Sequence, residues 1–104
     1  MGMGGKTMKS IYEKQILTLY LEGELNSYNS EEVEQEIEGI LSGKEIQTIV
    51  LDMENLRYIS SAGLRIIARL KQRCDDIALI HVPQGVYDIL EMVGFHNLMR
   101  IEKA

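Results

Sequence analysis

Short apolar runs recur along the chain and predict a set of β-strands. Residues 16–21 alternate between apolar and polar side chains, which is typical of a strand with one buried face. Residues 48–52 and 77–82 are almost continuously apolar, as expected of strands that are buried on both faces. We expect residues 10–13 to pair with the first strand as a short edge strand, and residues 98–101 to form the last strand.

Between these runs, the apolar positions recur every three or four residues, which predicts amphipathic helices. The first helix begins at Asn29 or Ser30, where Asn29 and Glu32 resemble a capping box, and it ends near Gly43. Its apolar face consists of Val33, Ile37, Ile40 and Leu41, and its opposite face of Glu31, Glu32, Glu34, Glu36 and Glu38. We interpret this acidic face as a solvated surface, with steering of a basic partner as the alternative.

Two further helices follow the same periodicity. The second begins at the Ser60–Ser61 pair and runs to about Cys74, with an apolar face formed by Leu64, Ile67, Leu70 and Cys74 and a basic ridge formed by Arg65, Arg69 and Arg73. The third lies between Pro83, which is tolerated at a first helical position, and Gly94, which suits a left-handed helix end. Its apolar stripe consists of Val86, Ile89, Leu90 and Val93.

The alternation of strands and helices predicts an α/β fold with a mainly parallel or mixed sheet. Residues 22–26 are expected to lead from the first strand to a loop, and residues 53–56 to form a loop. A chain of 104 residues forms one domain, from which we set residues 1–8 aside as a flexible tail or a cloning remnant.

Composition and charge exclude several classes of protein. The net charge of −5, a single Phe, no Trp and no basic cluster are unlike a nucleic-acid-binding protein. No apolar run approaches the roughly 20 residues of a membrane span, and no secretory segment is visible, so we expect no membrane partner. These features and the single cysteine, Cys74, favour a cytoplasmic protein.

The most informative stretch is Ser-Ser-Ala-Gly-Leu at 60–64, which joins an extended apolar segment directly to a helix. A serine at this place caps the helix, which stabilises it by roughly 1 kcal/mol. It can also accept a phosphate, because the backbone N–H groups and the dipole of a helix N-terminus favour an anion. Gly63 in the first turn costs roughly 1 kcal/mol relative to Ala, which close packing or access for a partner would repay.

Other catalytic and metal chemistry has little support in the sequence. An enzyme with Ser61 as nucleophile lacks the Gly-x-Ser-x-Gly turn, and neither histidine has a visible reason to approach that serine. No phosphate-binding Gly-Lys-Ser/Thr loop is present. His81 and His96 are far apart, with no Cys or carboxylate at ligand spacing, so we expect neither a metal site nor a cofactor.

Several motifs together resemble the STAS domain, the fold of bacterial anti-sigma factor antagonists and of the cytoplasmic tails of sulfate transporters. They are Glu-Gly-Glu-Leu-Asn at 22–26, Ile-Val-Leu-Asp at 49–52, Tyr-Ile-Ser-Ser-Ala-Gly-Leu-Arg at 58–65 and Glu-Met-Val-Gly-Phe at 91–95. The resemblance covers residues 9–104. It implies a mixed four- to five-stranded sheet with helices packed on one face.

The resemblance also implies a function. In the antagonist family, a serine at this helix start is phosphorylated by a serine kinase that is itself the anti-sigma factor. Binding of the unmodified antagonist frees the sigma factor, phosphorylation dissolves the complex, and a PP2C-type phosphatase resets it. Alignment on Gly63 places the phosphoacceptor at Ser61.

The implied partner-binding residues are Asn26, Ser60, Ser61, Ala62, Gly63, Arg65 and Arg69. Asn26 and Ser60 stand where the family frequently has aspartate, and Asp52 is a candidate acid near the acceptor. The alternative reading is a STAS adaptor subunit of another complex, in lipid transport or stress signalling, without serine phosphorylation.

Overall fold

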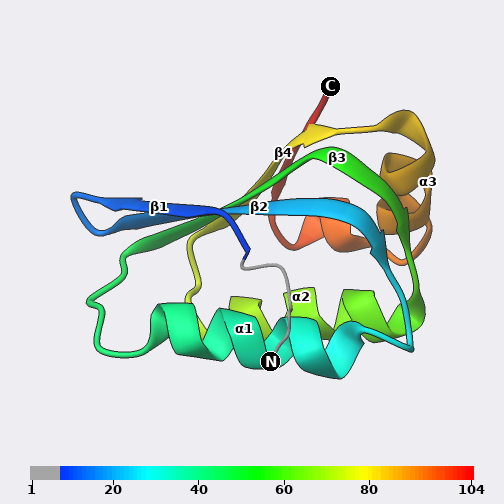
Figure 1. Ribbon diagram of the computed structural model, residues 1–104. Coiled ribbons are helices and arrows are strands. Elements are labelled where there is room, and N and C mark those ends of the chain that lie inside the picture. The colour runs from blue at the N-terminus through cyan, green and yellow to red at the C-terminus, as the bar shows by residue number, and fades with distance from the viewer. Residues whose placement is uncertain (1–7) are drawn as a thin grey trace.

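A computed structural model describes residues 8–104 of the chain, and it is built on a five-stranded sheet in the order β1-β2-β3-β4-β5 (Figure 1). The strands are β1 (Ser10–Glu13), β2 (Ile16–Leu25), β3 (Thr48–Ile59), β4 (Ile77–Val82) and β5 (Arg100–Lys103). β1 is antiparallel to β2, and the other neighbours are parallel. The predicted mixed sheet is therefore confirmed.

Three α-helices connect the parallel strands: α1 (Ser30–Leu41), α2 (Ser61–Arg73) and α3 (Gln84–Met92), followed by the 3-10 turn η1 (Phe95–Asn97). Figure 1 shows α1 and α2 side by side beneath one face of the sheet, with α3 beyond the end of β4. The core lies between these helices and the sheet. Its fully buried side chains include Leu19 of β2, Leu51 of β3, Ile37 of α1 and Ile67 of α2.

The predicted loop at 53–56 is wrong, and the first strand does not end at residue 21, because β2 and β3 continue together through most of residues 22–26 and 53–56. Leu25 pairs in register with Ile59, and Leu56 on β3 is 1% exposed, so the extension has its own buried face. Two irregularities in the pairing flank Glu22 and Gly23, and Gly23 adopts a φ of +73° that suits glycine. These irregularities hide the strand from a period-2 pattern.

Three predictions of element ends need correction. Asn29 occupies the N-cap position of α1 without a side-chain capping bond, so the predicted capping box is wrong. Pro83 is the N-cap of α3 rather than its first residue. The last strand begins at Arg100 because η1 occupies Phe95–Asn97. The left-handed Gly94 is confirmed, with φ +82°.

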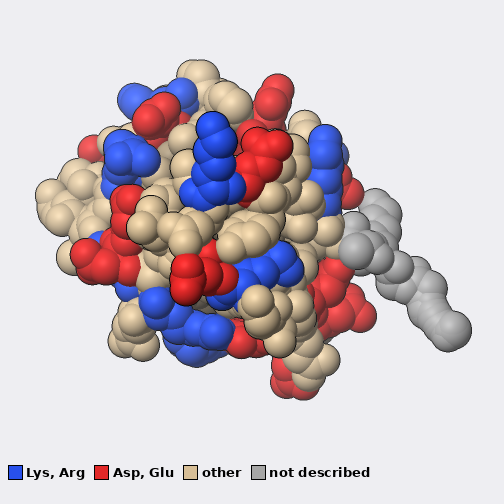
Figure 2. Space-filling model, turned by 90° about the vertical axis from the view of Figure 1, so that its left-hand side faces the viewer, with Lys and Arg blue, Asp and Glu red and all other residues tan. Residues whose placement is uncertain are grey.

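The predicted tail, residues 1–8, lies outside the described residues except for Met8, whose backbone N–H donates to the Glu36 carboxylate at 2.6 Å. Within residues 8–104, no helix is long and apolar enough to cross a membrane. On the side that carries the turn between β1 and β2, basic and acidic side chains are interspersed (Figure 2).

Candidate functional site

The junction between β3 and α2 separates the roles of its two serines. Ser60 is the N-cap of α2 in an extended conformation, and its Oγ accepts a hydrogen bond from the Gly63 N–H at 3.4 Å. The Ser60 N–H also donates to the Leu25 carbonyl at 2.9 Å, which ties the junction to the end of β2. The capping function therefore belongs to Ser60, and Ser61 is left without it.

Ser61 is the first residue of α2, and its side chain is exposed. Among the residues that the structure describes, none forms a hydrogen bond with its hydroxyl. The next two predicted site residues, Ala62 and Gly63, are buried and shape the junction from beneath. The arrangement presents one hydroxyl to solvent on a rigid backbone.

Gly63 is required by close packing. A Cβ atom at this position would lie 2.7 Å from Cγ1 of Ile59 and 2.8 Å from Cγ of Leu25, closer than carbon atoms approach in proteins. The absent side chain lets α2 begin directly against the ends of β2 and β3. Close packing therefore explains why a residue that disfavours helices lies in the first turn of α2.

Asn26 supports the loop beside the junction. Its Oδ1 accepts hydrogen bonds from the N–H groups of Tyr28 and Asn29, and the Asn29 Oδ1 accepts in return from the Asn26 N–H at 2.9 Å. Asn29 Nδ2 donates to the Glu24 carbonyl at 2.7 Å. The two amides fix a compact loop, so Asn26 has a structural task in the isolated chain.

Tyr28, at the tip of this loop, is 96% exposed. Sequence reasoning missed it, although an aromatic residue within the polar run Asn-Ser-Tyr-Asn was a usable signal. A large exposed aromatic side chain is a typical component of a protein interface.

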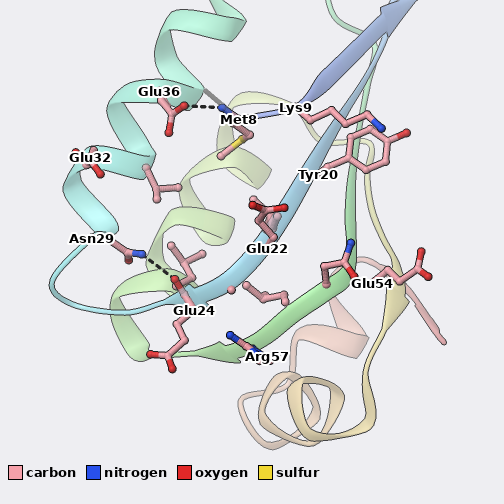
Figure 3. A pocket seen from close by; sticks show the side chains of 16 residues that line it. Met8, Lys9, Tyr20, Glu22, Glu24, Asn29, Glu32, Glu36, Glu54 and Arg57 are labelled. Carbon is pink, nitrogen blue, oxygen red and sulfur yellow. Dashed lines mark hydrogen bonds between the residues drawn. The ribbon is translucent and has the colours of Figure 1, made fainter. Parts of the chain in front are cut away.

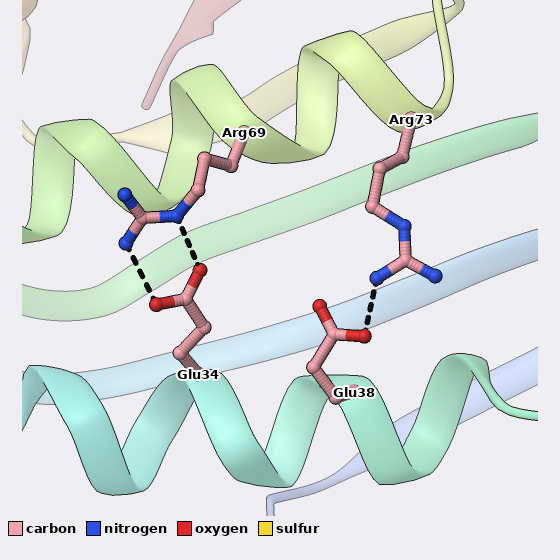
Figure 4. A network of polar contacts seen from close by, with 4 residues as sticks. All are labelled: Glu34, Glu38, Arg69 and Arg73. Carbon is pink, nitrogen blue, oxygen red and sulfur yellow. Dashed lines mark hydrogen bonds and ion pairs between the residues drawn. The ribbon is translucent and has the colours of Figure 1, made fainter.

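The basic ridge predicted on α2 divides into two parts. Arg69 forms a two-pronged ion pair with Glu34 of α1, at 2.6 and 2.7 Å, and Arg73 pairs with Glu38 one turn further on (Figure 4). Arg65 is exposed and forms no ion pair within the described residues. Two glutamates of the face that we expected to be merely solvated, Glu34 and Glu38, therefore form ion pairs with α2.

The ion pair between Glu34 and Arg69 makes stability depend on pH. The hydrogen bond that the Arg69 guanidinium donates to the Glu34 carboxylate lowers the pKa of Glu34 below the usual 4.5. The same hydrogen bond raises the pKa of Arg69. A carboxylate whose pKa is lowered on folding contributes stability above the unfolded-state pKa, and this contribution is lost as the pH falls through the folded-state pKa.

We therefore expect Glu34→Gln to destabilise the protein slightly at pH 7, and this effect to shrink as the pH falls below 4.5 and through the lowered pKa of Glu34. Chemical unfolding of both proteins at pH 7 and pH 3.5 measures the difference. Glu91→Gln on α3 is the control, because Glu91 forms no ion pair within residues 8–104. A destabilisation by Glu34→Gln that is equal at both pH values would contradict this account.

A broad groove of about 1140 Å³ lies beside the Asn26 loop, between α1 and the ends of β2 and β3 (Figure 3). Its charged lining residues are mostly acidic: Glu22, Glu24, Glu32, Glu36 and Glu54, against Lys9 and Arg57. Two of its lining residues connect it to the Asn26 loop: Asn29 is part of that loop, and Leu25 directly precedes it. The groove and the Ser61 surface are thus neighbours.

Three side chains from adjacent strands could hold a metal ion. Potential ligand atoms of Asp52, Glu54 and His81 all lie within 4.8 Å of one another. Spacing along the chain did not reveal them, because they come from β3 and β4. The Asp52 carboxylate already has two partners within this cluster. His81 Nδ1 lies 3.0 Å from it, and the backbone N–H of Glu54 donates a hydrogen bond to it.

Asp52 does not lie beside Ser61, contrary to the sequence-based expectation. It pairs in register with Tyr20 and Ile80 in the middle of the sheet, whereas Ser61 follows Ile59 at the far end of β3. His81 is engaged with Asp52, and no hydrogen bond joins Ser61 to a histidine within the described part of the chain. Nothing in this geometry resembles a serine nucleophile with its base.

The sequence model of the STAS domain matches residues 9–104. The chain belongs to the STAS domain family. Among curated proteins it is 32% identical to the "Putative anti-sigma factor antagonist BtrV" of Bordetella bronchiseptica, over 86% of this chain and 79% of that protein. It is 27% identical to the anti-sigma F factor antagonist of Paenibacillus polymyxa, over 86% of this chain and 80% of the relative. Both of these relatives are named as anti-sigma factor antagonists, the first of them as a putative one.

Solved structures of the antagonist SpoIIAA share the fold. The unphosphorylated form superposes with a TM-score of 0.76 at 16% identity, covering 90% of this chain and 86% of that one. The phosphorylated form, described as a Bacillus cell fate determinant, gives a TM-score of 0.68 at 15% identity, covering 90% of this chain and 89% of that one. The STAS fold predicted from the motifs is confirmed.

Proposed function

We propose that this STAS protein is an anti-sigma factor antagonist that binds an anti-sigma factor serine kinase and is switched off by phosphorylation of Ser61. It acts as a non-catalytic binding protein in the cytoplasm. A PP2C-type phosphatase removes the phosphate and restores binding.

The observation that carries this proposal is that the two serines at the start of α2 differ in role. Ser60 caps the helix, and Ser61 next to it is exposed and has no hydrogen-bond partner among the described residues. A hydroxyl that serves the fold would be costly to modify, whereas the Ser61 hydroxyl is free to react. Curated relatives named as antagonists support the same reading.

The binding surface consists of the exposed side chains around this hydroxyl. Arg65 follows one helical turn later, and Tyr28 projects from the loop that Asn26 and Asn29 hold in place. Ala62 and Gly63 are buried and contribute indirectly, since their small size lets α2 begin directly against the ends of β2 and β3. Arg69 contributes mainly by fixing α2 against α1 through Glu34.

The switch depends on charge rather than on a change of fold. A phosphate adds about −1.5 to −2 charge, and at a helix N-terminus the backbone N–H groups favour it. A kinase surface that closely contacts the unmodified serine would meet a buried negative charge instead. Like charges in such contact cost several kcal/mol, and about 2.7 kcal/mol already weakens binding a hundredfold.

Incubation of the protein with the candidate kinase and ATP, followed by intact-mass measurement, tests the proposal. We expect a mass gain of one phosphoryl group in the native protein and in Ser60→Ala, and none in Ser61→Ala. Ser60→Ala is the matched control, since it removes the adjacent hydroxyl at a helix-capping cost of about 1 kcal/mol. An unmodified protein that still binds the kinase would favour the adaptor function, and phosphorylation of Ser61→Ala would place the acceptor elsewhere.

A further inference from the structure

The ion pairs between α1 and α2 follow a constant spacing in the sequence. Glu34 pairs with Arg69 and Glu38 pairs with Arg73, in both cases 35 residues apart (Figure 4). Each step is one helical turn of four residues, so the two helices run parallel and in register. The pairs therefore form a ladder with one carboxylate and one guanidinium on each rung.

The ladder is incomplete at its amino-terminal end. One turn before Arg69 lies Arg65, and the same spacing places Ser30, the first residue of α1, opposite it. A serine offers no charge to the guanidinium. Arg65 is exposed and lacks an ion pair within residues 8–104, whereas Arg69 and Arg73 are both occupied.

We propose that Arg65, which has no partner in the ladder, holds the phosphate of phosphorylated Ser61 on the same helix. This inference rests on the proposed phosphorylation of Ser61. The two residues are four positions apart on α2, the spacing at which helical side chains meet. Long side chains on a helix lean toward its N-terminus, so Arg65 extends back toward Ser61.

The chemistry of the pair fits a phosphate better than the present hydroxyl. A guanidinium donates two parallel hydrogen bonds to phosphate oxygens, a geometry that a serine hydroxyl cannot match. Arg69 and Arg73 do not compete for the phosphate, because Glu34 and Glu38 already engage them. Arg65 is therefore a positioning residue for the modified state.

The pairing has a consequence for partner binding. In the unmodified protein, Arg65 is exposed and has no ion-pair partner among residues 8–104. In the modified protein, the same guanidinium is neutralised by the phosphate. Phosphorylation would then make the surface more negative, and the pairing would also withdraw the hydrogen-bond donors of Arg65 from an acidic partner surface.

Titration of the phosphate tests this inference directly. The full chain is produced with phosphoserine installed at position 61 during synthesis, so no kinase is needed, and the second pKa of the phosphate is followed by phosphorus NMR. A neighbouring cation favours the dianion, so Arg65→Gln should raise this pKa by about 0.3 or more relative to the native sequence. Arg65→Lys should restore part of the difference.

The control is Arg100→Gln, which removes the same charge from β5 and should leave the phosphate pKa unchanged. Equal pKa values in the native and Arg65→Gln proteins would overturn the inference. That result would leave phosphorylation by a kinase untouched. Conversely, a protein that no kinase modifies would contradict the proposed function while the installed phosphoserine still reports on Arg65.

Discussion

Ser61→Asp is expected to weaken binding to the anti-sigma factor kinase by about a hundredfold, whereas Ser61→Ala should bind within a few-fold of the native protein. A carboxylate at the first position of α2 suits the helix, so the fold is retained. The same carboxylate places a charge in the closest part of the interface, and a loss of about 2.7 kcal/mol produces the hundredfold effect.

Calorimetric titration of each variant with the unmodified kinase domain measures the effect. Ser10→Asp is a suitable control, because it adds the same charge at an exposed position of β1. Unchanged binding of Ser61→Asp would contradict the charge mechanism. An equal loss in Ser61→Asp and Ser61→Ala would show instead that the hydroxyl makes an essential contact.

The sequence predicted the elements whose pattern is local and missed those that depend on pairing. β4 matches the predicted residues 77–82 because its run is apolar except for His81. β2 and β3 were predicted too short, because Glu22-Gly23-Glu24 and Glu54-Asn55 contain the residue types of a loop. The pairing of β2 with β3 imposes the extended conformation on these residues. A short stretch of sequence does not reveal this pairing, because the two strands are about 30 residues apart in the chain.

The same division applies to the site. The exposed serine at a helix start and the unusual Gly63 were visible as a motif within five residues. The tasks of Arg69 and Asn26 were not, because their assignment needs the third dimension. Glu34 lies 35 residues from Arg69, and the side-chain oxygens of Asn26 and Asn29 each accept a hydrogen bond from the other residue's backbone N–H, while Asn29 makes no capping bond to α1.

Asp52 illustrates how a plausible local reading fails. It lies a few residues before the serine motif, so proximity in sequence suggested proximity in space. β3 is twelve residues long, and its extended backbone carries Asp52 toward His81 and away from Ser61. The length of β3 therefore decides whether Asp52 lies beside Ser61 or beside His81.

Gly63→Ala should destabilise the protein by about 2 kcal/mol, although alanine is the better helix former. Overpacking typically costs 1–3 kcal/mol, and here the new Cβ would lie below 3.0 Å from two side-chain carbons of Ile59 and Leu25. These atoms are close to the backbone of buried residues, so they cannot move aside without shifting the ends of β2 and β3. Alanine gains about 1 kcal/mol in helix propensity, and this gain reduces an overpacking cost near 3 kcal/mol to the expected net destabilisation.

Gly39→Ala on α1 provides a matched control, because a Cβ there would meet nothing within 4 Å. Both glycines are helical and both gain the same propensity term, so the difference between the two variants isolates the packing at the start of α2. Gly39→Ala should stabilise the protein by about 0.5–1 kcal/mol, with urea unfolding as the measurement. If Gly63→Ala were as stable as Gly39→Ala, the close approach of α2 to the strand ends would not be what requires glycine. A destabilised Gly63→Ala that also binds the kinase less well would link the rigid helix start to the presentation of Ser61.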